Sequence, residues 1–204
     1  MNPMENRILG LVWMVFIFLS LSLGFSPDLA GQEKHKKLYT AYNIWYEKPH
    51  NLRFINYKIG KLLPAGTKLD IPGKWGDKNP RRGDNSISFK AQGISFSLSF
   101  TYSFYPNQTL NSIFAKLFTS KNFLELTADM SEKEADGVKR GTPIVGMTKE
   151  EVLIAFGYPP EHRTKSLKLN RWTYWRTRTV YFYICFDEKE LVRHCHTPDD
   201  IWRG

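Results

Sequence analysis

The sequence is poor in cysteine, and the two cysteines that it has come late. Only Cys185 and Cys195 occur among the 204 residues, so lipid attachment at a bacterial N-terminal cysteine is excluded. On neighbouring predicted strands, pairing of Phe186 with Leu191 would turn the two cysteines to opposite faces. A disulfide needs converging side chains. We therefore expect no intramolecular bond, although an oxidising compartment would favour one.

Common catalytic motifs are also missing. The chain has no nucleophile elbow, phosphate-binding loop, zinc-protease helix or spaced carboxylate pair. The one suggestive cluster, His194 and His196 with Cys185, would place Cys185 diagonal to His194, with backbones ~7–8 Å apart, which favours a polar strand end over a metal site. We expect no enzymatic activity, no metal or other cofactor, and no small-molecule substrate.

Acidic residues are scarce relative to basic ones, 20 against 29. Residues 1–30 contain Arg7, Glu5 and Asp28, so the remainder has 28 basic and 18 acidic residues, a net charge of +10. In the cytoplasm this charge would suggest nucleic acid. Outside it, the available polyanions are phospholipid head groups, lipopolysaccharide and wall polymers. A solvated basic surface with no particular partner is the alternative.

The N-terminus predicts export. Residues 8–25, "ILGLVWMVFIFLSLSLGF", are apolar and uncharged, with Arg7 before them and a small, polar exit after them. This is the pattern of a secretory signal, and the run is also long enough to span a bilayer. Cleavage after Gly24 or Ala30 and retention as an inner-membrane anchor both remain open. A buried core helix fits badly because the run is apolar on every face. We expect a periplasmic or membrane-anchored protein with residues 1–30 as signal or anchor.

Residues 38–104 predict a small β domain. Five runs rich in aromatic and β-branched residues, such as "LYTAYNIWY" and "ISFSLSFTYSF", are separated by turn residues. Five short strands at this spacing indicate a small barrel. The phrase "KIGKLLPAGTKLDI" resembles the strand–turn–strand of bacterial SH3-like barrels, which implies a module that binds peptidoglycan or a stem peptide.

Residues 105–130 predict a helical connector, since apolar residues recur at helical spacing from Leu110 to Phe118 after a capping Thr109. Two further helices of similar design follow. Each begins at a hydroxyl residue with a glutamate three positions later and ends at a glycine that can take a left-handed cap. These capping residues are Ser131, Glu134 and Gly141 for the first helix and Thr148, Glu151 and Gly157 for the second.

Such a helix pair cannot bury its own apolar side and needs a sheet. The runs "RWTYWR", "VYFYICF" and "LVRHCH" provide a three-stranded antiparallel meander after it. Residues 131–204 are therefore expected to form an α+β domain of two helices on one small sheet. The class of the whole chain is α+β.

The order "SEKEADGVKRG…VGMTKEEVLIAFGYPP…NRWTYWR…VYFYICFDEKELVRH" resembles the SmpA/OmlA family, also called BamE-like. The resemblance covers residues 131–196. It implies the helix–helix–sheet fold just described and a role like that of the family's type member, an outer-membrane lipoprotein that assists β-barrel assembly and binds anionic phospholipid.

Finally, residues 163–178 concentrate positive charge without any acid. The cations are Arg163, Lys165, Lys168, Arg171, Arg176 and Arg178, interleaved with the aromatic residues Trp172, Tyr174 and Trp175. Amphipathic rings among cations suit a membrane–water boundary. The alternative places Trp172 and Tyr174 in the core and leaves the arginines solvated. We expect an anionic-surface contact here.

Three functions follow in order of support. The first is a non-catalytic envelope protein that binds or scaffolds, with an envelope protein or an anionic phospholipid surface as partner, in outer-membrane protein assembly or envelope maintenance. The second is a cell-wall module that binds peptidoglycan or peptide through the SH3-like part. The third is an enzyme. Nucleic acid is not an expected partner.

Overall fold

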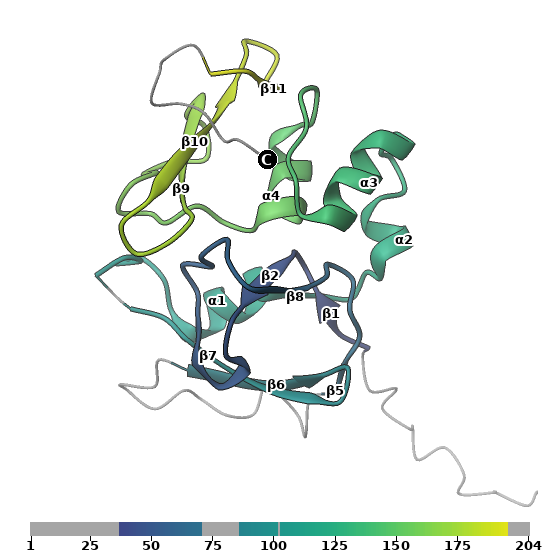
Figure 1. The fold of residues 1–204 in the computed structure, drawn as a ribbon, viewed down its shortest axis with the longest axis vertical. Helices are drawn as coiled ribbons and strands as arrows, with labels where there is room; N and C mark the ends of the chain where they lie inside the picture. Colours follow the sequence, from purple (N-terminus) through teal and green to yellow (C-terminus); the bar gives the residue numbers. More distant parts are fainter. Residues whose placement is uncertain (1–36, 71–85, 102, 196–204) are drawn as a thin grey trace, which may run out of the picture. The chain divides into compact units, whose positions relative to one another are not determined.

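The computed structural model describes residues 37–70, 86–101 and 103–195, which belong to one compact unit. The predicted signal segment, residues 1–30, lies outside the described residues. The helices are α1 (Leu110–Leu117), α2 (Phe123–Leu126), α3 (Glu132–Arg140) and α4 (Lys149–Phe156), all labelled in Figure 1. A 3-10 turn, η1 (Pro49–Asn51), precedes them in the chain. The strands are β1 (Tyr39–Thr40), β2 (Ile44–Tyr46), β3 (Leu52–Arg53), β4 (Lys61–Leu63), β5 (Leu69–Asp70), β6 (Ser86–Ala91), β7 (Ile94–Ser99), β8 (Phe118–Thr119), β9 (Arg171–Trp175), β10 (Tyr181–Phe186) and β11 (Val192–Arg193).

The α+β class is confirmed, but the N-terminal strands do not close into a barrel. In the described part of the chain they form a four-stranded sheet of order β3-β7-β6-β5 and two separate pairs, β2-β4 and β1-β8. Outside β6 and β7, the expected strand runs form strands of only two or three residues, and β1 pairs with β8 beyond the connector helix. Short, separately paired strands leave the sheet open, so the expected closed barrel is wrong for these residues.

The hairpin β6–β7 is the most regular part of this region. Its antiparallel register runs from Ser86 opposite Ser99 to Ala91 opposite Ile94. Gln92 and Gly93 make the turn, both with positive φ (51° and 77°), as a two-residue turn of type I′ requires. Burial alternates along β6, so one face of the sheet is packed and the other is exposed.

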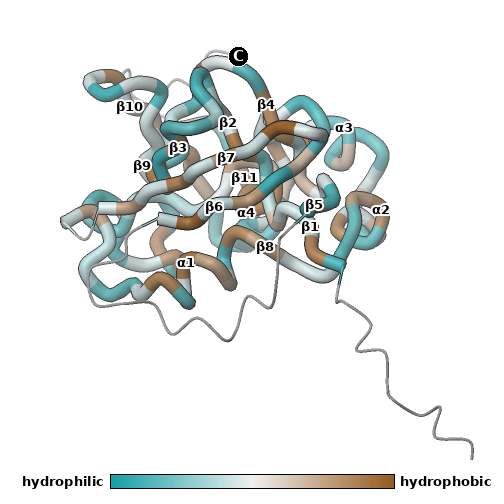
Figure 2. Tube along the Cα trace, turned by 90° about the horizontal axis from the view of Figure 1, so that it is seen from below, coloured by the Kyte–Doolittle hydropathy of each residue, from teal (hydrophilic) through white to brown (hydrophobic). Residues whose placement is uncertain are grey.

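Helix α1 packs on the buried face of this sheet, in one hydrophobic cluster with it. The predicted helix is confirmed: Thr109 caps it, and Ser112 completes a capping box. Brown and teal residues alternate along α1 in Figure 2, in keeping with its one-sided burial. The cluster includes Leu110, Ile113 and Leu117 of α1 together with Ile87, Phe89, Phe96 and Leu98 of the hairpin. The connector therefore belongs to the N-terminal core.

The two sharply defined helices α3 and α4 occur where the sequence predicts them. The side chains of Ser131 and Thr148 accept hydrogen bonds from the backbone N–H of Glu134 and Glu151, whose carboxylates reach back to the cap residues. Each helix thus begins with a reciprocal capping box.

The glycine ends of the two helices differ. Gly141 adopts the expected left-handed conformation (φ 64°, ψ 42°) after α3. Gly157 after α4 has positive φ (76°) but an extended ψ of −174°, so the expected left-handed helical cap is wrong there. Its carbonyl oxygen accepts a hydrogen bond from the hydroxyl of Tyr174 at 2.9 Å, which orients that peptide away from a helical turn.

The C-terminal sheet has the order β11-β10-β9 and is antiparallel throughout, as expected. Its last register differs from the prediction by one residue: Phe186 pairs with Val192 and not with Leu191. The Asp187 carboxylate explains the shift, because it accepts from the N–H groups of Lys189 and Leu191 and draws Leu191 into the turn. A turn one residue longer moves every later residue along the pairing.

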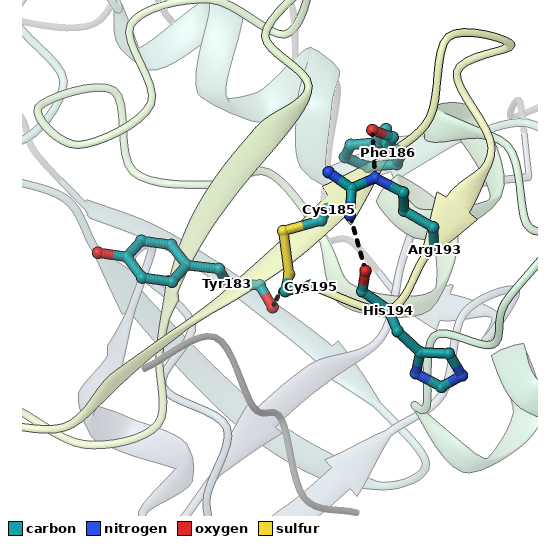
Figure 3. The surroundings of a disulfide bond; sticks show 6 residues. All are labelled: Tyr183, Cys185, Phe186, Arg193, His194 and Cys195. Atoms are coloured by element: carbon teal, nitrogen blue, oxygen red, sulfur yellow. Dashed lines mark hydrogen bonds between the residues drawn. A yellow bond between two sulfur atoms is a disulfide. The ribbon is translucent and has the colours of Figure 1, made fainter. Parts of the chain in front are cut away.

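The new register brings the two cysteines together. Cys185 and Cys195 form a disulfide with Cα atoms 5.3 Å apart, so the expectation of no intramolecular bond is wrong. Strand β11 ends at Arg193, and Cys195 turns back toward β10, as Figure 3 shows. The Arg193 side chain donates to the carbonyl oxygens of Phe186 and His194 beside the bond.

The second hydrophobic cluster lies between the helix pair and the inner face of this sheet. Met147 before the α4 cap and Val152 at its fourth position are both fully buried, as a hydrophobic staple requires. The cluster also contains Val138, Ala155, Phe156, Trp172, Tyr174, Phe182, Ile184 and Phe186. The helices and the sheet therefore cover each other's apolar faces.

Candidate functional site

The six cations of the predicted contact are all exposed. Arg163, Lys165 and Lys168 lie between α4 and β9, Arg171 begins β9, and Arg176 and Arg178 lie in the turn between β9 and β10. No ion pair joins any of the six to an acidic side chain within the described ranges. Their charge is therefore available to an external anion.

Two of the arginines are held against aromatic rings on the outer face of β9 and β10. The rings are Trp175, Tyr181 and Tyr183, in contact at centre distances of 5.5 Å and 5.7 Å. The guanidinium of Arg171 lies 4.7 Å from the ring centre of Tyr183, and that of Arg163 lies 5.4 Å from Trp175. Stacked guanidinium groups keep their hydrogen-bonding edges free, so this face combines ordered cations with amphipathic rings.

Two of the three predicted interfacial aromatics do not belong to this surface. Trp172 and Tyr174 are 0% and 1% exposed, since strand alternation turns both toward α4. The Trp172 indole N–H donates to the Leu167 carbonyl at 3.3 Å, and the Tyr174 ring lies 5.4 Å from Phe156. An interfacial role for these two residues is therefore wrong, and the alternative of core packing holds. Trp175 points outward and is partly exposed.

Exposed apolar side chains accompany the cations, and sequence reasoning missed them. Leu167, Leu169, Val180 and Tyr181 are between 38% and 50% exposed. Among the described residues, only Leu124 and Val145 join these four as exposed large hydrophobic side chains. The alternation "KSLKLN" at residues 165–170 was the available signal. It follows Pro159 and Pro160, which end the helix, and leucines that alternate with lysines in a loop need not face a core. Residues 163–181 are called the basic segment below.

The tip of the β9–β10 hairpin borders a hollow of about 620 Å³ with the chain from Trp45 to Ile59. Its charged lining residues are Lys48, Arg53, Arg178 and Glu47. The hollow thus adds two cations from the N-terminal region to the end of the basic segment. Sequence spacing gave no signal for this, because the contributing residues are more than a hundred positions apart.

Lys58 lies at the junction of the same elements and is chemically unusual. Its Nζ donates to the Phe156 carbonyl oxygen and lies 4.4 Å from the ring centre of Trp45 and 5.4 Å from that of Tyr174. Burial of the amine lowers the pKa of Lys58 well below its usual value. The carbonyl and ring contacts replace part of the lost hydration, and we assign this amine a structural role.

Cys185, one member of the metal cluster considered with His194 and His196, is not a free thiol in this structure. Cys185 is bonded to Cys195, and His196 lies outside the described residues. Within residues 37–70, 86–101 and 103–195, no three His, Cys, Asp or Glu side chains gather closely enough to hold a metal ion. Across the same ranges, every helix is too short or too polar to cross a bilayer.

Comparison with other proteins gives no relative from which a role can be transferred. No protein-family model, curated protein sequence or solved structure matches this chain.

Proposed function

We propose that this protein is a non-catalytic, exported component of the bacterial envelope that binds an anionic surface through its basic segment. The observation that carries the proposal is the gathering of six exposed cations, three exposed aliphatic side chains and three outward aromatic rings within residues 163–183. Cations bind anionic head groups, while apolar and amphipathic side chains enter the boundary between head groups and acyl chains.

The magnitude is sufficient for reversible binding. Each basic side chain near an anionic membrane contributes ~1 kcal/mol, so three or four acting together give measurable adsorption. The contribution falls with salt, because the Debye length shortens from about 10 Å at 0.1 M to about 3 Å at 1 M. Exposed leucine and valine side chains add a contribution that salt does not screen.

Two further features support an envelope role. Disulfides persist mainly outside the reducing cytoplasm, so the Cys185–Cys195 bond agrees with export by the N-terminal segment. The succession of two capped helices and a three-stranded meander agrees with the resemblance to the SmpA/OmlA family. We propose on this basis a role in outer-membrane protein assembly or envelope maintenance, with an envelope protein as a second partner.

Co-sedimentation with vesicles tests the proposal. The protein is used in the form that the cell exports, with phosphatidylglycerol-containing vesicles at low and high salt. An uncleaved N-terminal segment would also bind vesicles, so the comparison is between two variants of equal charge. The first, Lys168→Glu with Arg176→Glu and Arg178→Glu, changes the basic segment. The second, Lys68→Glu with Lys90→Glu and Lys121→Glu, changes exposed lysines elsewhere.

We expect the first variant to lose the salt-sensitive part of binding and the second to retain most of it. Equal loss in both variants would mean that only net charge matters and would contradict a specific segment. If purified peptidoglycan retained both variants and vesicles bound neither, the cell-wall alternative would be favoured.

A further inference from the structure

A second cavity, lined in part by Pro159, lies between α1 and the chain that follows α4. Its volume is about 560 Å³, within the range of small-ligand sites. The turn at Tyr105 and Asn107 and the α1 residue Lys116 form one wall, and residues 158–167 form the other. Elements distant in sequence thus enclose a space that neither core fills.

Glu161 lines this cavity, and only one of its two carboxylate oxygens has a partner among the described residues. Its Oε1 accepts a hydrogen bond from the Gln108 amide and lies 3.5 Å from the ammonium of Lys116. The Gln108 amide is itself oriented, because its oxygen accepts from the Ser112 hydroxyl at 2.9 Å. The second oxygen, Oε2, is enclosed and has no hydrogen-bond partner within the part of the chain that the structure describes. Enclosed acceptors are ordinarily satisfied, so Oε2 calls for a donor.

His162 adds a second such atom to the same wall. Its Nδ1 is enclosed and has no hydrogen-bond partner among the described residues, while its ring stacks on Phe104 at 4.8 Å. Burial and the neighbouring Arg163 lower the pKa of His162, which favours the neutral ring. Two polar atoms of neighbouring residues that line the cavity therefore lack a protein partner, and Lys116 lines the same cavity.

The other lining residues combine polar groups with rigid apolar surface. Asn107, Thr164, Lys165 and Ser166 offer donors and acceptors at the cavity wall. Tyr158, Pro106, Pro159 and Leu167 provide apolar area, and the Tyr158 ring is held 4.9 Å from the Lys116 ammonium. A ligand must therefore both donate and accept hydrogen bonds and present an apolar face.

We propose that this cavity binds a carbohydrate of one or two sugar rings. A hydroxyl donates to Glu161 Oε2 while a neighbouring hydroxyl accepts from Lys116, so one edge of a sugar supplies the partners that the ion pair leaves unfilled. A neutral ligand does this without bringing a further charge into a partly buried site, where charge is costly. The C–H face of the ring packs on Tyr158 and the prolines.

This inference goes beyond the proposed surface binding and does not depend on it. The two assignments share Lys165 and Leu167, but their tests use different residues, since the vesicle variant of the basic segment changes Lys168, Arg176 and Arg178, none of which lines this cavity. Either can fail while the other stands.

Saturation-transfer NMR on the exported protein tests the proposal with four probes: N,N′-diacetylchitobiose, cellobiose, maltose and the zwitterionic dipeptide alanyl-alanine. We expect at least one disaccharide to receive saturation from the protein. Glu161→Gln keeps the size of the side chain and its bond to Gln108 but removes the charged acceptor. It should weaken the binding of that disaccharide about tenfold, which corresponds to the loss of one hydrogen bond to a charged group.

Glu188→Gln is the matched control, because it removes the same charge from an exposed turn, and it should leave binding unchanged. Melting curves of both variants establish that they are folded. Three outcomes would overturn the carbohydrate assignment: no disaccharide binds, disaccharide binding is the same in Glu161→Gln as in the unaltered protein, or alanyl-alanine alone binds.

Discussion

The side-chain amide of Asn43 donates a hydrogen bond to the carbonyl oxygen of Val138 at 2.6 Å and a second to that of Ala155 at 3.0 Å. These carbonyls lie in the last turns of α3 and α4, where the regular helical donors are missing. The Val138 carbonyl also accepts from the Gly141 N–H at 2.9 Å. The Asn43 oxygen accepts from the Ala65 N–H at 2.7 Å. One buried side chain thus connects the N-terminal strands to the ends of both C-terminal helices.

Removal of this amide should destabilise the whole unit. Asn43→Ala leaves the Ala155 carbonyl oxygen and the Ala65 N–H buried without their partner, and each such group costs ~1–3 kcal/mol. The Val138 carbonyl loses one of its two donors and keeps the Gly141 N–H. We expect a loss of at least ~2 kcal/mol in the free energy of unfolding, measured by urea denaturation. Asn170→Ala, at an exposed position, is the control. A stability equal to that of the control would show that the junction is not held by Asn43.

Gly157 is required by its φ angle and by its neighbour. A Cβ at this position would lie 2.7 Å from ring atoms of Tyr42, whereas a Cβ at Gly93 would meet nothing within 4 Å. Both glycines have φ near +77°, but Gly157 combines this with a ψ of −174°, a backbone region that essentially only glycine adopts. An alanine would therefore be both strained and crowded at position 157. Gly157→Ala should therefore lower the melting temperature more than Gly93→Ala, by the equivalent of more than ~1 kcal/mol. Equal losses would contradict the crowding.

The disulfide should be present in the exported protein and should stabilise its last strand. Mass spectrometry without reductant is expected to show a monomer two hydrogens lighter than the reduced chain. Cys195→Ser should lower the free energy of unfolding by ~2–4 kcal/mol, the typical contribution of such a bond. A protein with two free thiols and unchanged stability after substitution would support the register in which the cysteines face apart.

Lys58 should make stability depend on pH. Its folded-state pKa is lowered, so between that value and its ordinary pKa the unfolded chain binds more protons, and stability rises with pH. We expect the melting temperature of the unaltered protein to rise relative to that of Lys58→Met from pH 7 to 10. The Phe156 carbonyl keeps a bond from Asn56 in the variant, which limits other effects. Parallel pH curves for the two proteins would contradict a perturbed Lys58.

Features that depend on residues close together in the chain could be predicted from the sequence. The capping boxes at Ser131 and Thr148 depend on residues three positions apart, and both were predicted. The alternation of Trp172 and Tyr174 against Trp175 was also readable. Which face is buried depends on α4, so the exposure of these rings could not be assigned from the strand alone.

Features that depend on distant residues were missed. The pairing of β1 with β8, and the approach of Arg53 to Arg178, bring together segments far apart in sequence. The shift in the last hairpin arises from one side chain, Asp187, whose turn includes Leu191. A one-residue error there reversed the predicted orientation of Cys195 and concealed the disulfide.

The orientation of the protein on an anionic surface is the central claim, and a single-site probe tests it most directly. A polarity-sensitive fluorophore is attached to a cysteine that replaces Val180 in the basic segment, or Leu124, the most exposed hydrophobic residue among those described, outside it. The native cysteines stay bonded and unlabelled. With phosphatidylglycerol vesicles at low salt, we predict a blue-shifted, brighter emission at position 180 and no change at position 124. A shift at position 124 alone, or an equal shift at both positions, would contradict binding through residues 163–181.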